Sequence, residues 1–396
     1  SCTDIFIPPP FTTTMPEKQQ GQQIIEGLDL DALMQAMRGP GRNLLVKLES
    51  ENVNAPFTIT IVQDGDIKRG KTSNYGPVEI GQELIRIAEM VNSAASKSIF
   101  DEAPILEGDE ADADTRHNLQ EAMDLVATAG WQLYEFLYAC PAFKYLIDCI
   151  KTLDPGSRIA ISTDRCFLPW NILYPKAFNP KWNNNGSSSA ESQLFWGHLY
   201  HFETRLLCEI GDQPRQLSDK GKRLVNLNVN PSLEKKLAEG PTPLICTHER
   251  FFLNKEYVEK FNKSGSEIQQ VLTSKSTEAG LLYFYCHGES EKPYQVGHSE
   301  RLEFQEGFEH FRPGDIRTDP KFKASPVVFL NSCGSGAFSP LLFNNFHERL
   351  KIAGARGMIV TDFSIPIKTG GYIGQIILNE YAERKPIGKS LFELRN

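Results

Sequence analysis

The sequence predicts an α/β fold built on a mainly parallel β-sheet with helices on both faces. From Glu267 to Arg384, short apolar runs alternate with segments of helical spacing, which is typical of right-handed βαβ crossovers. Two of these runs, 281–286 (L-L-Y-F-Y-C) and 326–331 (P-V-V-F-L-N), are apolar almost throughout. Strands buried on both faces show such continuous hydrophobicity, whereas half-exposed strands alternate.

The amino-terminal segment differs from the remainder in composition. Residues 1–22 are rich in Pro, Thr and Gln and lack the basic and apolar regions of a signal peptide. Helical spacing over 24–37 ends before Gly39-Pro40-Gly41, a strong stop signal. We therefore assign residues 1–42 to an N-terminal tail or linker and a helix.

Taken in order, the following segments have the patterns of strands, helices or polar loops. Strands are expected at 44–49, 57–62, 158–162, 224–229, 243–246, 281–286, 326–331 and 358–361. Helices are expected at 80–94, 118–138, 143–153, around Ile268, at 340–351 and at 371–384. The acidic segment 101–114 is interpreted as a solvated insertion or, alternatively, a docking surface for a basic partner. Residues 181–193 have the composition of a flexible loop.

The two buried strands end in residues with catalytic chemistry. The run 326–331 is followed by Ser332-Cys333-Gly334, and the run 281–286 is followed by His287-Gly288. Ligands of parallel sheets bind outside the carboxyl ends of the strands. A Cys/His pair there suits nucleophilic catalysis, because the imidazole takes the thiol proton and the thiolate attacks a carbonyl. The alternatives are a buried thiol, a backbone-bonded histidine and plain turn glycines. We interpret the other seven histidines as structural or solvated.

Three motifs together resemble one family. Y-F-Y-C-H-G, F-L-N-S-C-G-S-G and the stretch R-I-A-I-S-T-D-R-C-F-L-P-W-N-I-L-Y-P at 158–175 resemble the CHAT family of caspase-like peptidases in clan CD, which includes caspases, metacaspases, separases and gingipains. The separation of His287 and Cys333, 333 − 287 = 46, is near the roughly 50 residues typical of caspases. The resemblance spans 43–396. It implies a caspase-like three-layer sandwich, with a degenerate half at 43–223 and a catalytic half at 224–396.

The resemblance also implies roles for the strand-end residues. Cys333 would be the nucleophile and His287 the general acid/base. The backbone N–H groups of Gly288 and Cys333 would bind the oxyanion, and Gly334 would allow close backbone approach. Loss of one oxyanion donor typically costs ~10²–10³ in rate.

Five residues are expected to bind substrate. Asp164 follows the strand at 158–162, where clan members keep residues of the S1 pocket, and its carboxylate would favour Lys or Arg at P1. Arg165 would instead favour an acidic P1. Asn331 stands where metacaspase-like sequences carry Asp, so one carboxylate is lost. Asp362 and Phe363 begin a substrate-cleft segment in which family members often carry Trp.

The resemblance therefore predicts a cysteine endopeptidase that cleaves a specific partner protein. Family members are commonly bacterial and joined to sensor modules, and some act in anti-phage defence. We expect a protein substrate and an activating sensor or partner. The polar segment 289–315 between the catalytic strands is a candidate order–disorder switch, or a loop that merely tolerates insertion. The alternative functions are a non-catalytic scaffold, which the Cys/His pair disfavours, and an acyltransferase, which lacks a recognisable CoA or nucleotide motif here.

Composition excludes several other classes. The sequence lacks an apolar run near the ~18 residues of a membrane span, so we expect no membrane association. The net charge of −8 argues against direct nucleic-acid binding. The eight cysteines are scattered without C-x-x-C, which predicts reduced thiols in the cytoplasm and neither a metal nor another cofactor.

Overall fold

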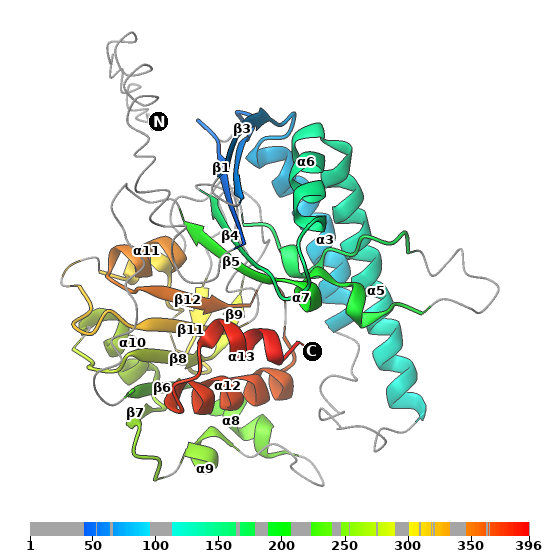
Figure 1. Cartoon of the computed structure of the whole chain (residues 1–396). Helices are drawn as coiled ribbons and strands as arrows, with labels where there is room; N and C mark the ends of the chain where they lie inside the picture. Colours follow the sequence, from blue (N-terminus) through cyan, green and yellow to red (C-terminus); the bar gives the residue numbers. More distant parts are fainter. Residues whose placement is uncertain are drawn as a thin grey trace, which may run out of the picture.

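A computed structural model describes the chain from 43 to 395 with gaps. The described residues are 43–52, 54–63, 66–95, 113–163, 167–178, 189–206, 223–239, 247–252, 254–274, 276–289, 301–308, 310–317, 319, 321–332, 346–361, 363 and 365–395. Within these ranges, the strands form two five-stranded sheets and one two-stranded ribbon (Figure 1). The expected helix at 24–37 and the strand at 243–246 lie outside the described residues.

The first sheet is mixed and has the order β3-β2-β1-β4-β5. β1 pairs antiparallel with β2 and parallel with β4, and β4 pairs parallel with β5. The strands are β1 (Leu44–Glu49), β2 (Thr58–Gln63), β3 (Asp66–Thr72), β4 (Arg158–Thr163) and β5 (His201–Leu206). Three long helices accompany them: α3 (Pro77–Ala95), α5 (Ala113–Ala139) and α6 (Pro141–Lys151). The sequence patterns at 44–49, 57–62 and 158–162 are thus confirmed as strands.

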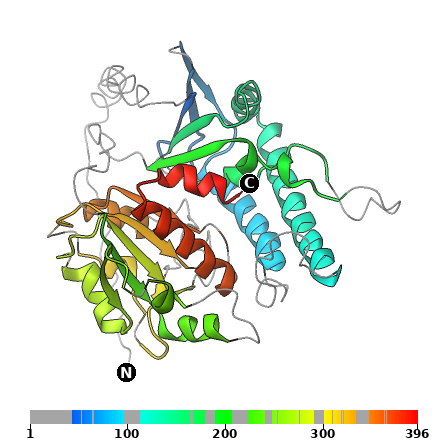
Figure 2. The ribbon, with the colours of Figure 1, turned by 60° about the horizontal axis from the view of Figure 1, so that its bottom comes forward.

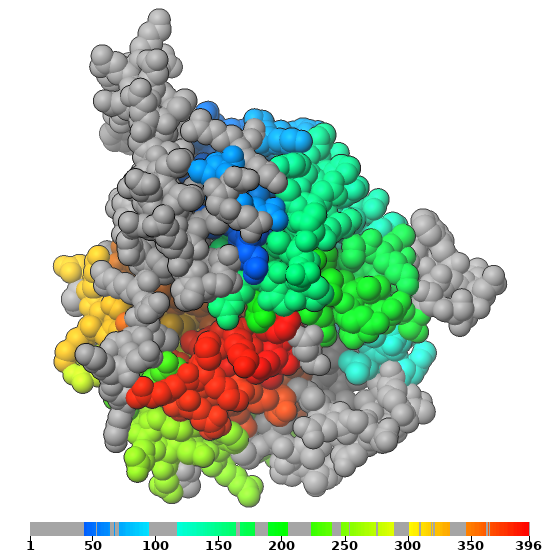
Figure 3. Space-filling view, in the orientation of Figure 1, coloured from blue at the N-terminus to red at the C-terminus, as the bar shows by residue number. Residues whose placement is uncertain are grey.

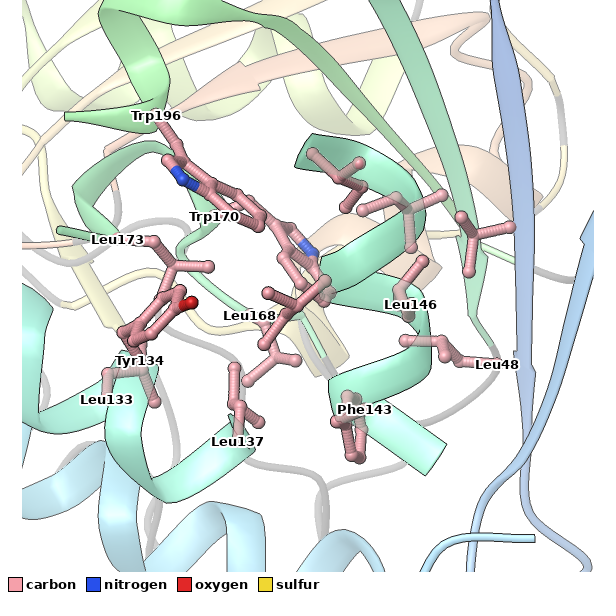
Figure 4. Packing of buried hydrophobic residues seen from close by; sticks show 14 of the residues in the cluster. Leu48, Leu133, Tyr134, Leu137, Phe143, Leu146, Leu168, Trp170, Leu173 and Trp196 are labelled. Atoms are coloured by element: carbon pink, nitrogen blue, oxygen red, sulfur yellow. The ribbon is translucent and has the colours of Figure 1, made fainter. Parts of the chain in front are cut away.

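The core of this half is aromatic as well as aliphatic. Figure 4 shows the side chains of Leu137 and Leu146 near Trp170 and Trp196, all of them buried. Trp170 belongs to the short helix η2 (Trp170–Ile172) and Trp196 to α7 (Trp196–Leu199). The Pro169-Trp170 motif therefore places an indole in the core of the first half, where its large apolar area stabilises the fold.

The second sheet is entirely parallel and has the order β12-β11-β8-β6-β7. Its strands are β6 (Val225–Val229), β7 (Val258–Asn262), β8 (Leu281–Tyr285), β11 (Val327–Asn331) and β12 (Gly357–Val360). β6, β8 and β11 are buried at every position. This confirms the expectation from their continuous apolar runs.

Helices cover both faces of the second sheet and complete three layers. One face packs against α8 (Pro231–Ala238), α9 (His248–Phe252) and α12 (Ile367–Ala382). The opposite face packs against α10 (Gly265–Ser274) and α11 (Phe346–Ile352). The prediction of a mainly parallel sheet with helices on both faces is therefore confirmed for residues 225–382.

The dipeptide Asn230-Pro231, directly after the strand expected at 224–229, starts a helix, because Asn230 caps α8 by accepting a hydrogen bond from the Ser232 N–H at 2.9 Å. Proline suits the first position of a helix, so the same dipeptide starts a new element. The segment 289–315 is not uniformly a polar loop, because β10 (Arg301–Glu303) pairs with β9 (His287–Glu289). Three apolar residues of the segment are buried: Leu302, Phe304 and Phe311.

The carboxyl-terminal helix α13 (Ile387–Glu393) connects the two halves. In Figure 2 this red helix lies between the strands of the first sheet and the remainder of the second half, and Figure 3 shows the red surface between those of the two halves. The Phe392 ring stacks on His201 of β5. Arg395 donates a hydrogen bond from Nη1 to Asn171 Oδ1 at 2.8 Å. The strands of the two sheets come from 44–206 and 225–360, while the assignment of a degenerate and a catalytic half stays a prediction.

Gly374 is required for the approach of α12 to the second sheet. A Cβ atom at this position would lie 2.1 Å from Tyr283 Oη, which is fully buried in β8. We expect Gly374→Ala to lower the free energy of unfolding by about 1–3 kcal/mol despite a gain of up to ~1 kcal/mol in helix propensity. Urea denaturation followed by circular dichroism measures this change.

Gly388 in α13 supplies the matched control. A Cβ atom at Gly388 would meet nothing within 4 Å, so Gly388→Ala should leave stability unchanged or raise it. Equal destabilisation by the two substitutions would contradict the steric explanation.

Candidate functional site

The pairing of β8 with β11 defines the candidate site. The two strands are adjacent and parallel, and their last paired residues are Tyr285 and Asn331. In the sequence, His287 follows Tyr285 by two positions and Cys333 follows Asn331 by two positions. Because parallel strands end at the same edge of a sheet, this register directs both segments towards one edge. Cys333 and Gly334 themselves lie outside the described residues.

His287 and Gly288 begin the ribbon strand β9. His287 is opposite Glu303 and Gly288 is opposite Leu302 of β10. The Leu302 N–H donates to the Phe311 carbonyl at 2.8 Å, and the Leu302 carbonyl accepts from the Phe311 N–H at 2.9 Å. The backbone groups of Leu302 therefore face Phe311, so Gly288 and Leu302 are a non-hydrogen-bonded pair. The Gly288 N–H consequently points away from β10.

Asn331 ends β11 in a buried position. It is 2% exposed, and its Nδ2 donates to Tyr283 Oη at 2.8 Å and to the Gly370 carbonyl at 2.6 Å. Both amide hydrogens are therefore used inside the protein, on the face covered by α12. The expected contact of Asn331 with substrate stays a prediction, and its described contacts are structural.

The other expected substrate-binding residues lie near the boundary between the halves or outside the described ranges. Phe363 follows β12, is half-buried and packs against the hydrophobic core of the first half. Asp164, Arg165 and Asp362 lie outside the described residues, so their roles stay predictions. Phe167, three positions after Asp164, has its ring centroid 5.1 Å from that of His347 in α11. The segment that follows β4 thus contacts the second half.

A buried polar cluster beneath the site was not anticipated from the sequence. Of the two alternatives for His248, structural or solvated, the structure supports the first, because His248 is completely buried between Glu234 and Tyr283. Its Nδ1 lies 2.9 Å from Glu234 Oε2, and its Nε2 lies 3.0 Å from Tyr283 Oη. The signal in the sequence was Tyr283 itself, because a tyrosine in a fully buried strand needs a partner for its hydroxyl.

The described part of the chain contains neither a cluster of metal ligands nor a membrane-spanning helix. There, no group of three or more His, Cys, Asp and Glu side chains could hold a metal ion. Within the same ranges, no helix has the length and apolar character needed to cross a membrane. Cys140, Cys149 and Cys286 are buried as reduced thiols.

Comparisons with known proteins gave a match among solved structures alone. No protein-family model matches the chain, and a search of curated proteins also found no match. Among solved structures, the chain is similar to a chain in the crystal structure of the Saccharomyces cerevisiae separase–securin complex, with a TM-score of 0.45 and 8% sequence identity. The match covers 92% of this chain and 29% of that chain. This chain thus spans less than a third of the length of that matched chain.

The buried Nδ1 of His347 predicts a pH dependence of stability. Burial, assisted by Lys351, lowers the pKa of His347 from 6.5 to about 4. The unfolded chain binds more protons than the folded chain between these values. The stabilisation is therefore present above pH 6.5 and is lost as the pH falls towards 4. Urea denaturation at pH 7 and pH 5 should show a smaller pH dependence for His347→Gln than for the wild type.

His117 provides a control for this measurement. Its side chain is 73% exposed on α5, so His117→Gln should retain the wild-type pH dependence. An unchanged pH dependence in His347→Gln would show that His347 is not buried as a neutral imidazole.

Proposed function

We propose that the chain is a cysteine endopeptidase with Cys333 as nucleophile and His287 as general acid/base. The observation that carries the proposal is the register of β8 with β11, which pairs Tyr285 with Asn331. In the sequence, a potential base, His287, follows Tyr285 by two positions, and a potential nucleophile, Cys333, follows Asn331 by two positions. The carboxyl edge of a parallel sheet, where the pairing of β8 with β11 ends, is the usual place for ligand chemistry in such folds.

In the proposed reaction, the His287 imidazole takes the proton of the Cys333 thiol. The thiolate attacks the carbonyl carbon of the scissile peptide bond, and the carbonyl oxygen becomes an oxyanion. The C–N bond then breaks, and the leaving amine takes the proton from His287. Water, deprotonated by His287, hydrolyses the resulting thioester and releases the thiol.

Two backbone N–H groups would stabilise the oxyanion, those of Gly288 and Cys333. The orientation of the Gly288 N–H away from β10, derived from the Leu302–Phe311 hydrogen bonds, supports its part in the proposal. A ladder-bonded N–H would be unavailable to a substrate, so the non-bonded position of Gly288 matters for the chemistry.

The proposal includes a protein substrate in the cytoplasm and activation by a sensor or partner in bacterial defence. These parts rest on the resemblance of the three sequence motifs to the CHAT family. Leu302, Phe304 and Phe311 of the segment 289–315 are buried, so an activating change that disordered this part would expose three apolar side chains.

An acyloxymethyl ketone panel with Arg, Lys, Asp and Leu at P1 tests the dyad directly. Such reagents alkylate an activated thiolate, so the wild type should be labelled at Cys333, as located by mass spectrometry. Cys333→Ala should abolish labelling, and His287→Ala should reduce its rate by ~10³-fold or more.

The buried neighbour Cys286 is the matched control, since it directly precedes His287 and is 3% exposed. Cys286→Ala should retain labelling at Cys333. Absence of wild-type labelling in the presence of every activator tested, together with intact protein binding, would favour the scaffold alternative.

Substrate selectivity depends on which charged residue lines S1. If Asp164 does so, Asp164→Ala should reduce kcat/KM for peptides with Lys or Arg at P1 by roughly 10- to 100-fold, through the lost charge-assisted hydrogen bond. Peptides with Leu at P1 should change less than about threefold, since they make no such bond. A consistent preference for acidic P1 residues, lost in Arg165→Ala, would overturn this assignment.

A further inference from the structure

The carboxyl end of β11 is held by a side-chain contact beyond the strand ladder. β11 and β12 pair in parallel as far as Leu330 and Val360. One residue further, the Thr361 hydroxyl donates a hydrogen bond to the Ser332 carbonyl. Ser332 is 1% exposed. The threonine side chain thus continues the attachment of β11 to its neighbour where backbone pairing has stopped.

A second anchor holds the preceding residue, Asn331. Because a carbonyl can only accept hydrogen bonds, the Gly370 carbonyl requires the amide nitrogen of Asn331 to face α12. The same nitrogen donates to Tyr283 Oη. This orientation leaves Asn331 Oδ1 buried without a hydrogen-bond partner among the described residues.

The Tyr283 hydroxyl is itself fixed from the opposite side. Burial raises the pKa of Tyr283 far above its ordinary value, so the hydroxyl stays protonated. The hydroxyl accepts from Asn331 and lies 3.0 Å from His248 Nε2, and the tautomer that satisfies its hydrogen is the one in which Nε2 accepts it. The His248 hydrogen is then on Nδ1 and donates to Glu234 Oε2 at 2.9 Å. A hydrogen-bond chain therefore runs from α8 through α9 and β8 to β11.

The other oxygen of Glu234 completes this chain. Glu234 Oε1 accepts from the Glu249 backbone N–H at 2.9 Å. Asn331, Tyr283, His248 and Glu234 are all buried, so water does not compete for these bonds. Low local dielectric strengthens such a network and fixes one orientation of each member.

We propose that Thr361 and the Tyr283–Asn331 pair are positioning residues for the peptide group between Ser332 and Cys333. A peptide group is planar, so fixing the Ser332 carbonyl also fixes the direction of the next N–H. The hydroxyl of Thr361 polarises the same group, which makes that N–H a better donor. This inference rests on the proposed function, in which the N–H of Cys333 binds the oxyanion.

Substitutions at Thr361 test the inference through kinetics. Thr361→Val keeps the shape and removes the hydroxyl, and should lower kcat by about 10- to 100-fold while KM stays within about twofold. Thr361→Ser retains a hydroxyl and should restore kcat to within about threefold of the wild type. Equal losses in the two variants, or a loss confined to KM, would overturn the assignment.

Tyr283→Phe tests the second anchor by hydrogen exchange as well as turnover. Loss of the hydroxyl should accelerate exchange of the backbone amides of Leu330 and Asn331, which lie in the ladders of β11, by about tenfold, which corresponds to one lost hydrogen bond. The control is Tyr174→Phe in the first half. Tyr174 is also fully buried, and its hydroxyl accepts from the Glu191 N–H. Tyr174→Phe should therefore leave exchange at both amides of β11 unchanged.

Hydrogen exchange tests the anchoring of β11 independently of the proposed peptidase activity. If the wild type cleaves no peptide but exchange is faster in Thr361→Val and Tyr283→Phe, the anchoring role is supported and the proposed peptidase function is wrong. Unchanged exchange and turnover in both variants would overturn the positioning role, whatever the wild-type activity. If Tyr283→Phe does not fold, Glu234→Gln replaces it, because it breaks the same chain at the carboxylate.

Discussion

The register between β8 and β11 is the constraint on which the candidate site depends. A shift of one residue would move every side chain of a strand to the opposite face of the sheet. Here it would place Tyr283 on the α10 face and remove its hydroxyl from His248 and Asn331. It would also end the pairing of Tyr285 with Asn331. Complete burial of β8 and β11 therefore specifies the fold and the site together.

The buried polar residues add orientation to this register. Hydrophobic packing alone would hold β11 in the sheet, but it is non-directional. The hydrogen bonds of Asn331 and Ser332 specify how the strand ends. Gly370 and Gly374 of α12 leave room for the Asn331 amide and the Tyr283 hydroxyl. Glycine is about 1 kcal/mol per residue less favourable than alanine in a helix. At these two positions of α12 it makes room for a buried polar group.

The sequence predicted the buried parallel strands well because their apolar runs are continuous. It did not predict β7, because V-E-K-F-N has only one fully buried residue, the polar Asn262, and no continuous apolar run. It also missed the role of His248, since Glu234 and Tyr283 approach it only after three elements have packed. Asp164, Arg165 and Asp362 were identified from the family resemblance. Their side-chain directions depend on tertiary contacts that periodicity does not encode, so the P1 preference stayed open.

The pH dependence of alkylation at Cys333 tests the central claim most directly. The rate of modification by iodoacetamide, followed by mass spectrometry of the peptide containing Cys333, reports the thiolate fraction. If His287 and Cys333 form a dyad, the wild-type midpoint should lie well below the ordinary thiol pKa of ~8.5. In His287→Ala it should return to about that value. Identical midpoints near 8.5 in both proteins would contradict the dyad.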